Sequence, residues 1–223
     1  MLVAVGLLAG CTDGQPEPAA TSPTVAASET LPETRGEPHE SELPATWDER
    51  PDGPAPTPAD QLDARALHAL LRTRAEQAAT ATTCAPDDVE LALAGFDVAT
   101  GHRYTSVVVT NTADEPCTLA GRPGLGARGE WGRAFTNPVE RGLTVDGSDP
   151  GRVRLQPGGR AASLLEWTGA LAGAEDERAA LLVVQLAAGQ VPVGVPAEVE
   201  GALPDIGTLT TLAAGPFEAY PRA

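Results

Sequence analysis

Residues 104–117 read YTSVVVTNTADEPC, and this stretch decides the fold class that we expect. Three consecutive valines beside threonines give a β-branched run that is typical of a buried strand. The Asn, Asp and Pro residues of 111–116 are typical of a turn that reverses the chain, and we expect the returning strand to begin at Cys117. The stretch therefore predicts a strand over 104–110, followed by a reversal.

The chain beyond residue 84 continues this pattern of short β-type runs separated by turns. We expect further strands at residues 89–94, 152–155, 161–168, 180–187, 190–199 and 208–213. The glycine-rich residues 121–126 are expected to form a turn, because Pro123 removes an amide donor and no lysine follows to complete a phosphate-binding loop. Seven or eight short strands predict an all-β domain, an immunoglobulin-like β-sandwich over residues 84–223, with a barrel as the alternative.

The first ten residues, MLVAVGLLAG, form an apolar run. It is shorter than the roughly 20 residues that a membrane-spanning helix needs, and it matches the apolar part of an export signal. Leu8, Ala9 and Gly10 precede Cys11 in an order that resembles the bacterial lipobox, whose cysteine receives diacylglycerol. We expect residues 1–10 to be a lipoprotein signal peptide, truncated at its start because no basic residue precedes it, and Cys11 to be lipidated. The alternative is an ordinary apolar N-terminus with a chance cysteine.

Residues 12–58 contain ten prolines among Glu, Thr, Ser and Ala. Such a segment buries too little apolar surface to offset a backbone entropy cost of about 1–2 kcal/mol per residue. We therefore expect residues 11–58 to be a disordered acidic stalk. In residues 59–83 leucines recur at helical spacing, which predicts a short helix or linker within 59–80 whose apolar side packs on the domain. His68 in this segment is expected to be solvated.

The charge of the chain limits its partners. It has 31 acidic residues against 15 basic ones, all of them arginine, and a formal net charge of −16. Nucleic-acid binding needs clustered cations that neutralise phosphates, so we expect no nucleic-acid partner. We expect a soluble monomer kept apart from its copies by charge, and the alternative is a role in holding cations or basic partners.

Cys84 and Cys117 enclose two of the strand candidates. In an exported chain we expect these two thiols to form a disulfide, which would stabilise the domain by about 4 kcal/mol for a loop of roughly 34 residues. A zinc site is the weaker alternative, because zinc needs about four ligands and only His39, His68 and His102 accompany the thiols. We expect no metal and no cofactor.

The residues around these cysteines also resemble a known family. The motif comprises Cys84, Gly101-His102-Arg103-Tyr104, Val109-Thr110-Asn111-Thr112, Pro116-Cys117-Thr118-Leu119, Gly121 and Pro123-Gly124, followed by LxPGGxA at 155–161 with Leu165 and Trp167. Over about residues 84–220 it resembles the domain of unknown function 4232, which occurs largely in secreted lipoproteins of high-GC Gram-positive bacteria. Many members carry a second cysteine pair towards the C-terminus, and this chain has none. Each motif residue also has a structural use in a strand or turn, so the motif does not mark a functional site.

The sequence contains no recognisable catalytic set, and we expect no catalytic residues. No Gly-x-Ser-x-Gly motif occurs, His102 has no acid partner evident from the sequence, and the carboxylates at 175–177 are expected to lie in a solvated loop. We therefore expect a non-enzymatic binding module, anchored by Cys11 to the extracytoplasmic face of the cell membrane, with an envelope polymer or protein as partner. The alternative is a cell-envelope glycan hydrolase that uses loop carboxylates such as Asp146 or Asp149.

Overall fold

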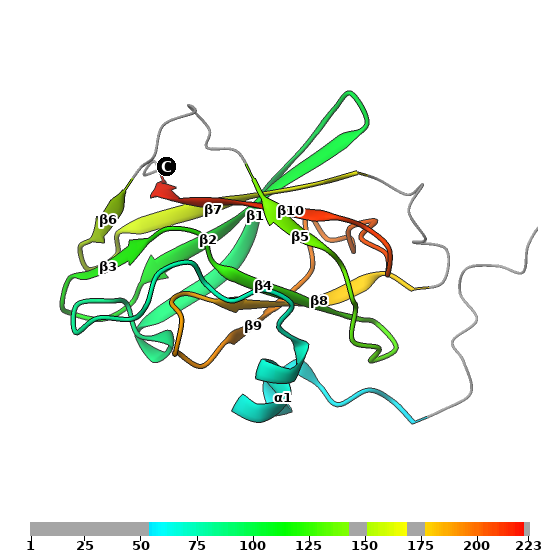
Figure 1. Ribbon diagram of the computed structural model, residues 1–223, viewed down its shortest axis with the longest axis horizontal. Helices are drawn as coiled ribbons and strands as arrows, with labels where there is room; N and C mark the ends of the chain where they lie inside the picture. Colours follow the sequence, from blue (N-terminus) through cyan, green and yellow to red (C-terminus); the bar gives the residue numbers. More distant parts are fainter. Residues whose placement is uncertain (1–53, 143–150, 169–176, 221–223) are drawn as a thin grey trace, which may run out of the picture. The chain divides into compact units, whose positions relative to one another are not determined.

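The computed structural model describes residues 54–142, 151–168 and 177–220, all of which belong to one unit of the chain, Pro44–Ala223. These residues contain one α-helix, α1 (Ala64–Leu70), and two 3₁₀ turns, η1 (Ala59–Gln61) and η2 (Pro86–Asp88). Their strands are β1 (Val89–Ala99), β2 (His102–Asn111), β3 (Cys117–Ala120), β4 (Gly124–Gly129), β5 (Val139–Arg141), β6 (Arg152–Leu155), β7 (Arg160–Thr168), β8 (Ala179–Gln185), β9 (Val193–Pro196) and β10 (Leu212–Ala219). The expected all-β sandwich is confirmed (Figure 1).

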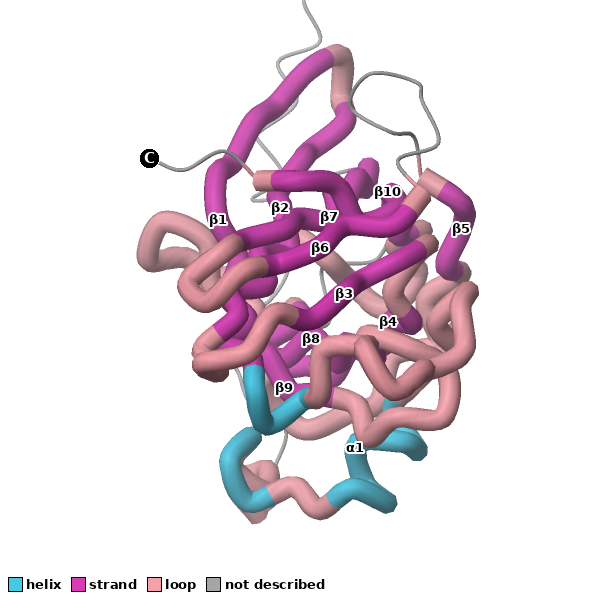
Figure 2. The backbone as a smooth tube through the Cα atoms, turned by 90° about the vertical axis from the view of Figure 1, so that its left-hand side faces the viewer, coloured by secondary structure: helices cyan, strands magenta, loops and turns pink. Residues whose placement is uncertain are grey.

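The strands of the described residues form three sheets. Five strands run in the order β1-β2-β7-β10-β5, three in the order β4-β8-β9, and β3 pairs with β6. All neighbours are antiparallel except β10 and β5, which are parallel. Figure 2 shows the five-stranded and three-stranded sheets on opposite sides of the core, with β3 and β6 between them in this view.

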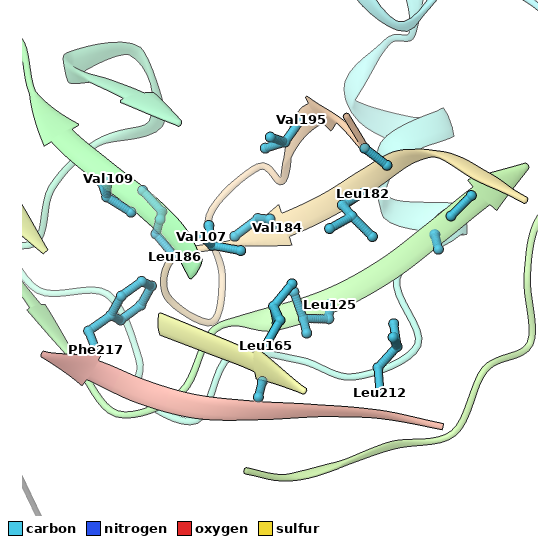
Figure 3. Packing of buried hydrophobic residues seen from close by; sticks show 14 of the residues in the cluster. Val107, Val109, Leu125, Leu165, Leu182, Val184, Leu186, Val195, Leu212 and Phe217 are labelled. Atoms are coloured by element: carbon cyan, nitrogen blue, oxygen red, sulfur yellow. The ribbon is translucent and has the colours of Figure 1, made fainter. Parts of the chain in front are cut away.

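The core lies between the two larger sheets. β7 alternates between partly exposed and buried residues, as a strand with one face on the core should. The valine run of the sequence contributes Val107 and Val109, both fully buried on β2, and the three-stranded sheet contributes Leu182 and Val184 opposite them. Figure 3 shows these side chains pointing toward one another. Burying a side chain of this size contributes roughly 1.5–3 kcal/mol, so this cluster holds the two sheets together.

The strand that begins at Cys117 does not return along β2. The expected start of a strand at Cys117 is confirmed, but β2 lies between β1 and β7, whereas β3 pairs with β6. The reason lies in the Asn111 side chain, whose Nδ2 donates to the carbonyl of Glu115 at 2.8 Å and to that of Leu155 at 3.3 Å. These bonds fix the turn against the end of β6, and the chain leaves the five-stranded sheet there.

The glycine-rich residues 121–126 were expected to be a turn, but residues from Gly124 onward form β4, which is buried along its whole length and pairs with β8. Its glycines serve close packing. A Cβ at Gly126 would lie 2.0 Å from the carbonyl oxygen of Leu70, and one at Gly124 would lie 2.7 Å from the backbone nitrogen of Ala75. Another segment of backbone therefore rests directly on β4, which only glycine permits.

The last strand also differs from the expectation. A strand was expected over 208–213, but β10 begins at Leu212 and continues to Ala219. Residues 207–210 form a turn in which the Gly207 amide donates to Thr210 Oγ1 at 2.8 Å. Asn137 stabilises this turn because its Nδ2 donates to the carbonyls of Gly207 and Thr210, each at 2.7 Å. An irregularity between Ala214 and Phe217 accommodates Gly215 and Pro216 within the strand.

Residues 54–83, which we call the strap, cover the outer face of the three-stranded sheet. α1 begins at the N-cap Asp63, whose carboxylate accepts from the Ala66 amide at 2.7 Å. Leu67 and Leu70 on α1 pack against Leu181 and Val183 on β8, so the expected packing of this segment on its own domain is confirmed. The helix occupies residues 64–70 of the range 59–80 in which a short helix was expected, because beyond Leu70 the strap runs extended across β4 and donates twice to the Leu125 carbonyl.

The start of the strap is also attached to the sandwich. Arg128 on β4 is largely buried, and its Nη1 donates to the Thr57 carbonyl at 2.7 Å. Burial lowers the pKa of this guanidinium, because a charged group is less well solvated there. The packed unit therefore includes residues ahead of Cys84. Within the described part of the chain, no helix is long and apolar enough to cross a membrane.

Candidate functional site

Two pockets are lined by residues of the short edge strand β5. The first, which we call the arginine pocket, has a volume of about 250 Å³. It is lined by Thr73, Arg74, Glu76, Arg122, Pro123, Val139, Glu140, Arg141 and Ala214. Its charged side chains come from three separate parts of the fold: the strap, the turn between β3 and β4, and β5.

Glu76 organises the arginine pocket. Its Oε2 accepts from the Arg122 amide at 3.2 Å and from Arg122 Nη1 at 3.3 Å, and its Oε1 lies 3.7 Å from Arg141 Nη2. Arg122 also donates from Nη2 to the Gly142 carbonyl at 3.4 Å. One carboxylate thus holds the Arg122 guanidinium and lies within ion-pair distance of the largely exposed Arg141 guanidinium. The Nε of Arg122 is buried with no hydrogen-bond partner among the described residues.

The strap that carries Arg74 and Glu76 is fixed by backbone contacts. The Glu76 amide donates to the Arg122 carbonyl at 2.9 Å, and the Ala75 amide donates to Gln185 Oε1 at 3.1 Å. Arg74 also lines a neighbouring pocket of about 500 Å³, together with His68. Arg74 therefore lies on a segment that hydrogen bonds of its backbone hold in place, and its side chain lines two neighbouring pockets.

The second pocket beside β5, which we call the histidine pocket, has a volume of about 240 Å³. Its lining includes His102 and Glu166, whose Nδ1 and Oε1 lie 2.7 Å apart, and it shares Glu140 and Arg141 with the arginine pocket. The acid partner that the sequence did not show for His102 is therefore Glu166, 64 positions further along the chain.

Strand register brings these groups together. Glu166 on β7 pairs with Tyr104 on β2 and with Ala213 on β10, and Ala213 pairs in turn with Glu140 on β5. All four residues lie in one row across the five-stranded sheet, on the face away from the core. The His102 ring stacks on that of Tyr104, with centroids 6.4 Å apart. The small Ala213 leaves room between the two carboxylates.

The predicted disulfide is confirmed. Cys84 and Cys117 are joined, with their Cα atoms 4.8 Å apart, and Cys84 is fully buried. The Cys84 amide donates to the Thr118 carbonyl at 3.1 Å, and the Thr118 amide donates to the Thr82 carbonyl at 2.8 Å. The bond therefore fastens the end of the strap to the start of β3.

The expectation of a solvated acidic loop at 175–177 is wrong for Glu177. Its side chain is fully buried, its Oε1 accepts from the Trp131 amide at 2.8 Å, and its Oε2 lies 3.5 Å from Arg133 Nε. A Cβ at Gly129 would collide with this carboxylate at 2.0 Å. Glu177 thus stabilises the turn after β4. This structural role could not be predicted, because residues 175–177 form an acidic run that is typical of a solvated loop.

Several predicted site residues lie outside the described part of the chain: Cys11, His39, Asp146, Asp149, Glu175 and Asp176. Within the described residues, no group of three or more His, Cys, Asp or Glu side chains could hold a metal ion. The arginine pocket could not be predicted from the sequence, because Arg74, Arg122 and Arg141 are far apart in the chain and no local pattern links them.

One comparison with known proteins gives a match. The family model of DUF4232, a domain of unknown function, matches residues 84–216, which is more than half of the chain. The chain belongs to this family. The DUF4232 match includes Arg122, Glu140 and Arg141 of the arginine pocket, whereas Arg74 and Glu76 precede it. No curated protein and no solved structure matches the chain.

Proposed function

We propose that this protein is an extracytoplasmic lipoprotein whose DUF4232 domain is a non-catalytic binding module that engages a component of the cell envelope. The observation that carries the proposal is the pair of pockets beside β5, where charged side chains from distant segments converge on an edge of the sheet. Fixed guanidinium, carboxylate and imidazole groups around a concave surface are what a recognition site needs.

The three cysteines support the proposed location. The apolar segment ending in Leu8-Ala9-Gly10-Cys11 supports lipidation of Cys11, and an anchor of two or more acyl chains would hold the protein at the membrane. The disulfide between Cys84 and Cys117 supports an oxidising compartment, because such bonds are rare where thiols are kept reduced. The net charge of −16 supports a monomer without a nucleic-acid partner.

The charged groups support binding rather than catalysis. In the histidine pocket His102 is paired with Glu166, and in the arginine pocket Glu76 is shared by Arg122 and Arg141. Such pairs hold side chains in fixed orientations and present donors and acceptors to a partner. Their arrangement supports recognition of a polar envelope polymer or protein.

The proposal is tested in intact cells that express the chain with a functional export signal. We expect mass spectrometry to find an acylated Cys11, and the Cys11→Ser variant to leave the membrane fraction while keeping its disulfide. Crosslinking on these cells should recover an envelope component, and substitutions in the two pockets should reduce that recovery. An unmodified product with free thiols would overturn the location, and recovery that pocket substitutions leave unchanged would overturn the site.

A second candidate function, a cell-envelope glycan hydrolase, is favoured by one observation. Glu140 and Glu166 line the same pocket on either side of Ala213. Neighbouring strands lie about 4.8 Å apart, so the Cα atoms of the two residues are separated by roughly 10 Å. Inverting glycosidases hold their two carboxyl groups about 6.5–9.5 Å apart, a separation that two glutamate side chains can reach from Cα atoms placed in this way. Release of reducing ends from isolated cell wall, abolished by Glu166→Gln, would favour this function over binding alone.

A further inference from the structure

The arginine pocket is a positively charged hollow on an acidic protein. Three arginines and two glutamates line it, which gives a local net charge of +1 in a chain of net charge −16. Glu76 already pairs with Arg122 and Arg141, but Arg74 has no ion-pair partner among the described residues. The strap therefore contributes to the pocket the Arg74 guanidinium, a positive charge that no carboxylate of the described residues pairs with.

The hydrogen-bonding capacity of the pocket is also incompletely used. The Nε of Arg122 is buried without a partner among the described residues, and a buried charged donor that lacks an acceptor is costly. A guanidinium group presents several donors in one plane, which suits the two free oxygens of a carboxylate or a phosphate group. Arg74, whose exposed side chain lines the pocket and has no ion-pair partner among the described residues, thus offers donors of the kind that an oxyanion accepts.

We propose that the arginine pocket binds a singly charged oxyanion group with two free oxygens, such as a phosphodiester or a sugar carboxylate of an envelope polymer. This inference names the ligand class of a pocket in the proposed binding module and rests on that proposal. The local charge of +1 is balanced by one negative charge on the ligand. A second negative charge would be repelled by the carboxylates of Glu76 and Glu140. A pocket of about 250 Å³ has room for the anionic group and part of the sugar or polyol that carries it.

The test is isothermal titration calorimetry on the full chain carrying Cys11→Ser, purified from an exporting host so that the disulfide forms. The probes are glycerophosphoglycerol for the phosphodiester, glucuronate for the carboxylate, and glycerol as the neutral control. We expect saturable binding of at least one anion, weakened by added salt, and no binding of glycerol. Binding of the diester alone indicates a phosphodiester polymer, and binding of glucuronate alone indicates an acidic polysaccharide.

Three variants separate the site from the overall charge of the protein. Arg74→Gln should weaken binding about tenfold, as loss of a charged hydrogen bond does. Arg65→Gln, which removes an exposed arginine of α1 outside the pocket, should leave the affinity unchanged. Glu140→Gln removes a negative charge from the pocket lining and should tighten binding about threefold, a direction that structural damage would not produce.

The inference is overturned if neither anion binds saturably, if Arg74→Gln and Arg65→Gln have equal effects, or if Glu140→Gln weakens binding. Such a result leaves the proposed function standing when crosslinking still recovers an envelope component. Conversely, the titration uses the unlipidated chain. If the three variants change anion binding as expected, the inference therefore holds even if Cys11 is not lipidated in cells.

Discussion

The contact between the strap and β4 gives a sharp prediction for Gly126→Ala. The new Cβ would lie 2.0 Å from the Leu70 carbonyl oxygen. The position of a Cβ is fixed by its own backbone and the oxygen belongs to the backbone of the strap, so the strap must retreat by more than about 1 Å to reach an ordinary contact distance. Overpacking of this kind costs about 1–3 kcal/mol. The retreat also loosens Leu67 and Leu70 from β8, and full exposure of a leucine costs roughly 1.5–3 kcal/mol. We expect a loss of about 3 kcal/mol in the free energy of unfolding.

Urea denaturation measures this loss, and limited trypsin digestion locates it. Arg72 and Arg74 lie in the extended part of the strap, so a loosened strap should be cut there faster than in the unaltered protein. The matched control is Gly194→Ala on β9, whose Cβ would meet only the side-chain ends of Leu181 and Leu67 at 3.3–3.5 Å and should cost under about 1 kcal/mol. Equal stability and equal digestion of the two variants would refute the docking of the strap on β4.

Two further predictions concern the covalent and polar supports of the domain. Joint replacement of Cys84 and Cys117 by alanine should lower the free energy of unfolding by about 4 kcal/mol, and a loss below about 1 kcal/mol in urea denaturation would contradict the stabilising role of the bond. Glu177→Ala should cost about 1–3 kcal/mol because it leaves the Trp131 amide unsatisfied, whereas Arg133→Ala, at a side chain that is 56% exposed, should cost under about 1 kcal/mol. Thermal or urea unfolding in which Arg133→Ala costs as much as Glu177→Ala would show that the ion pair, and not the buried hydrogen bond, matters.

The strands that could be predicted from the sequence are those whose side chains carry the signal. The β-branched residues 104–110 and the alternating residues 161–168 correspond closely to β2 and β7. β4 was not predicted because its glycines are typical of a turn. They are needed because the backbone of the strap packs directly on the strand, and this contact is not visible in the amino-acid sequence. The range of β10 was predicted wrongly for a related reason. Gly215 and Pro216 are typical of a turn, but in the structure they lie at an irregularity inside the strand.

The two pockets could be predicted even less well. His102 and Glu166 meet because β2 and β7 are neighbours in the sheet, and the sequence does not reveal that pairing. Arg74 reaches Arg122 only because the strap crosses β4. By contrast, the pairing of Cys84 with Cys117 was predictable, because these are the two cysteines that remain once Cys11 is assigned to the lipid.

The position of the disulfide at the end of the strap also determines how the domain would respond to tension. A pull on the chain ahead of Pro54 would first break the hydrogen bond between Arg128 and Thr57 and then peel α1 and the extended segment from β4 and β8. Peeling would stop at Cys84, because its sulfur is covalently joined to β3. The strap could thus release about 100 Å of slack at roughly 3.4 Å per residue while the sandwich stays folded. This release would take Arg74 and Glu76 out of the arginine pocket, whereas the histidine pocket, whose lining contains no residue of the strap, would keep its shape.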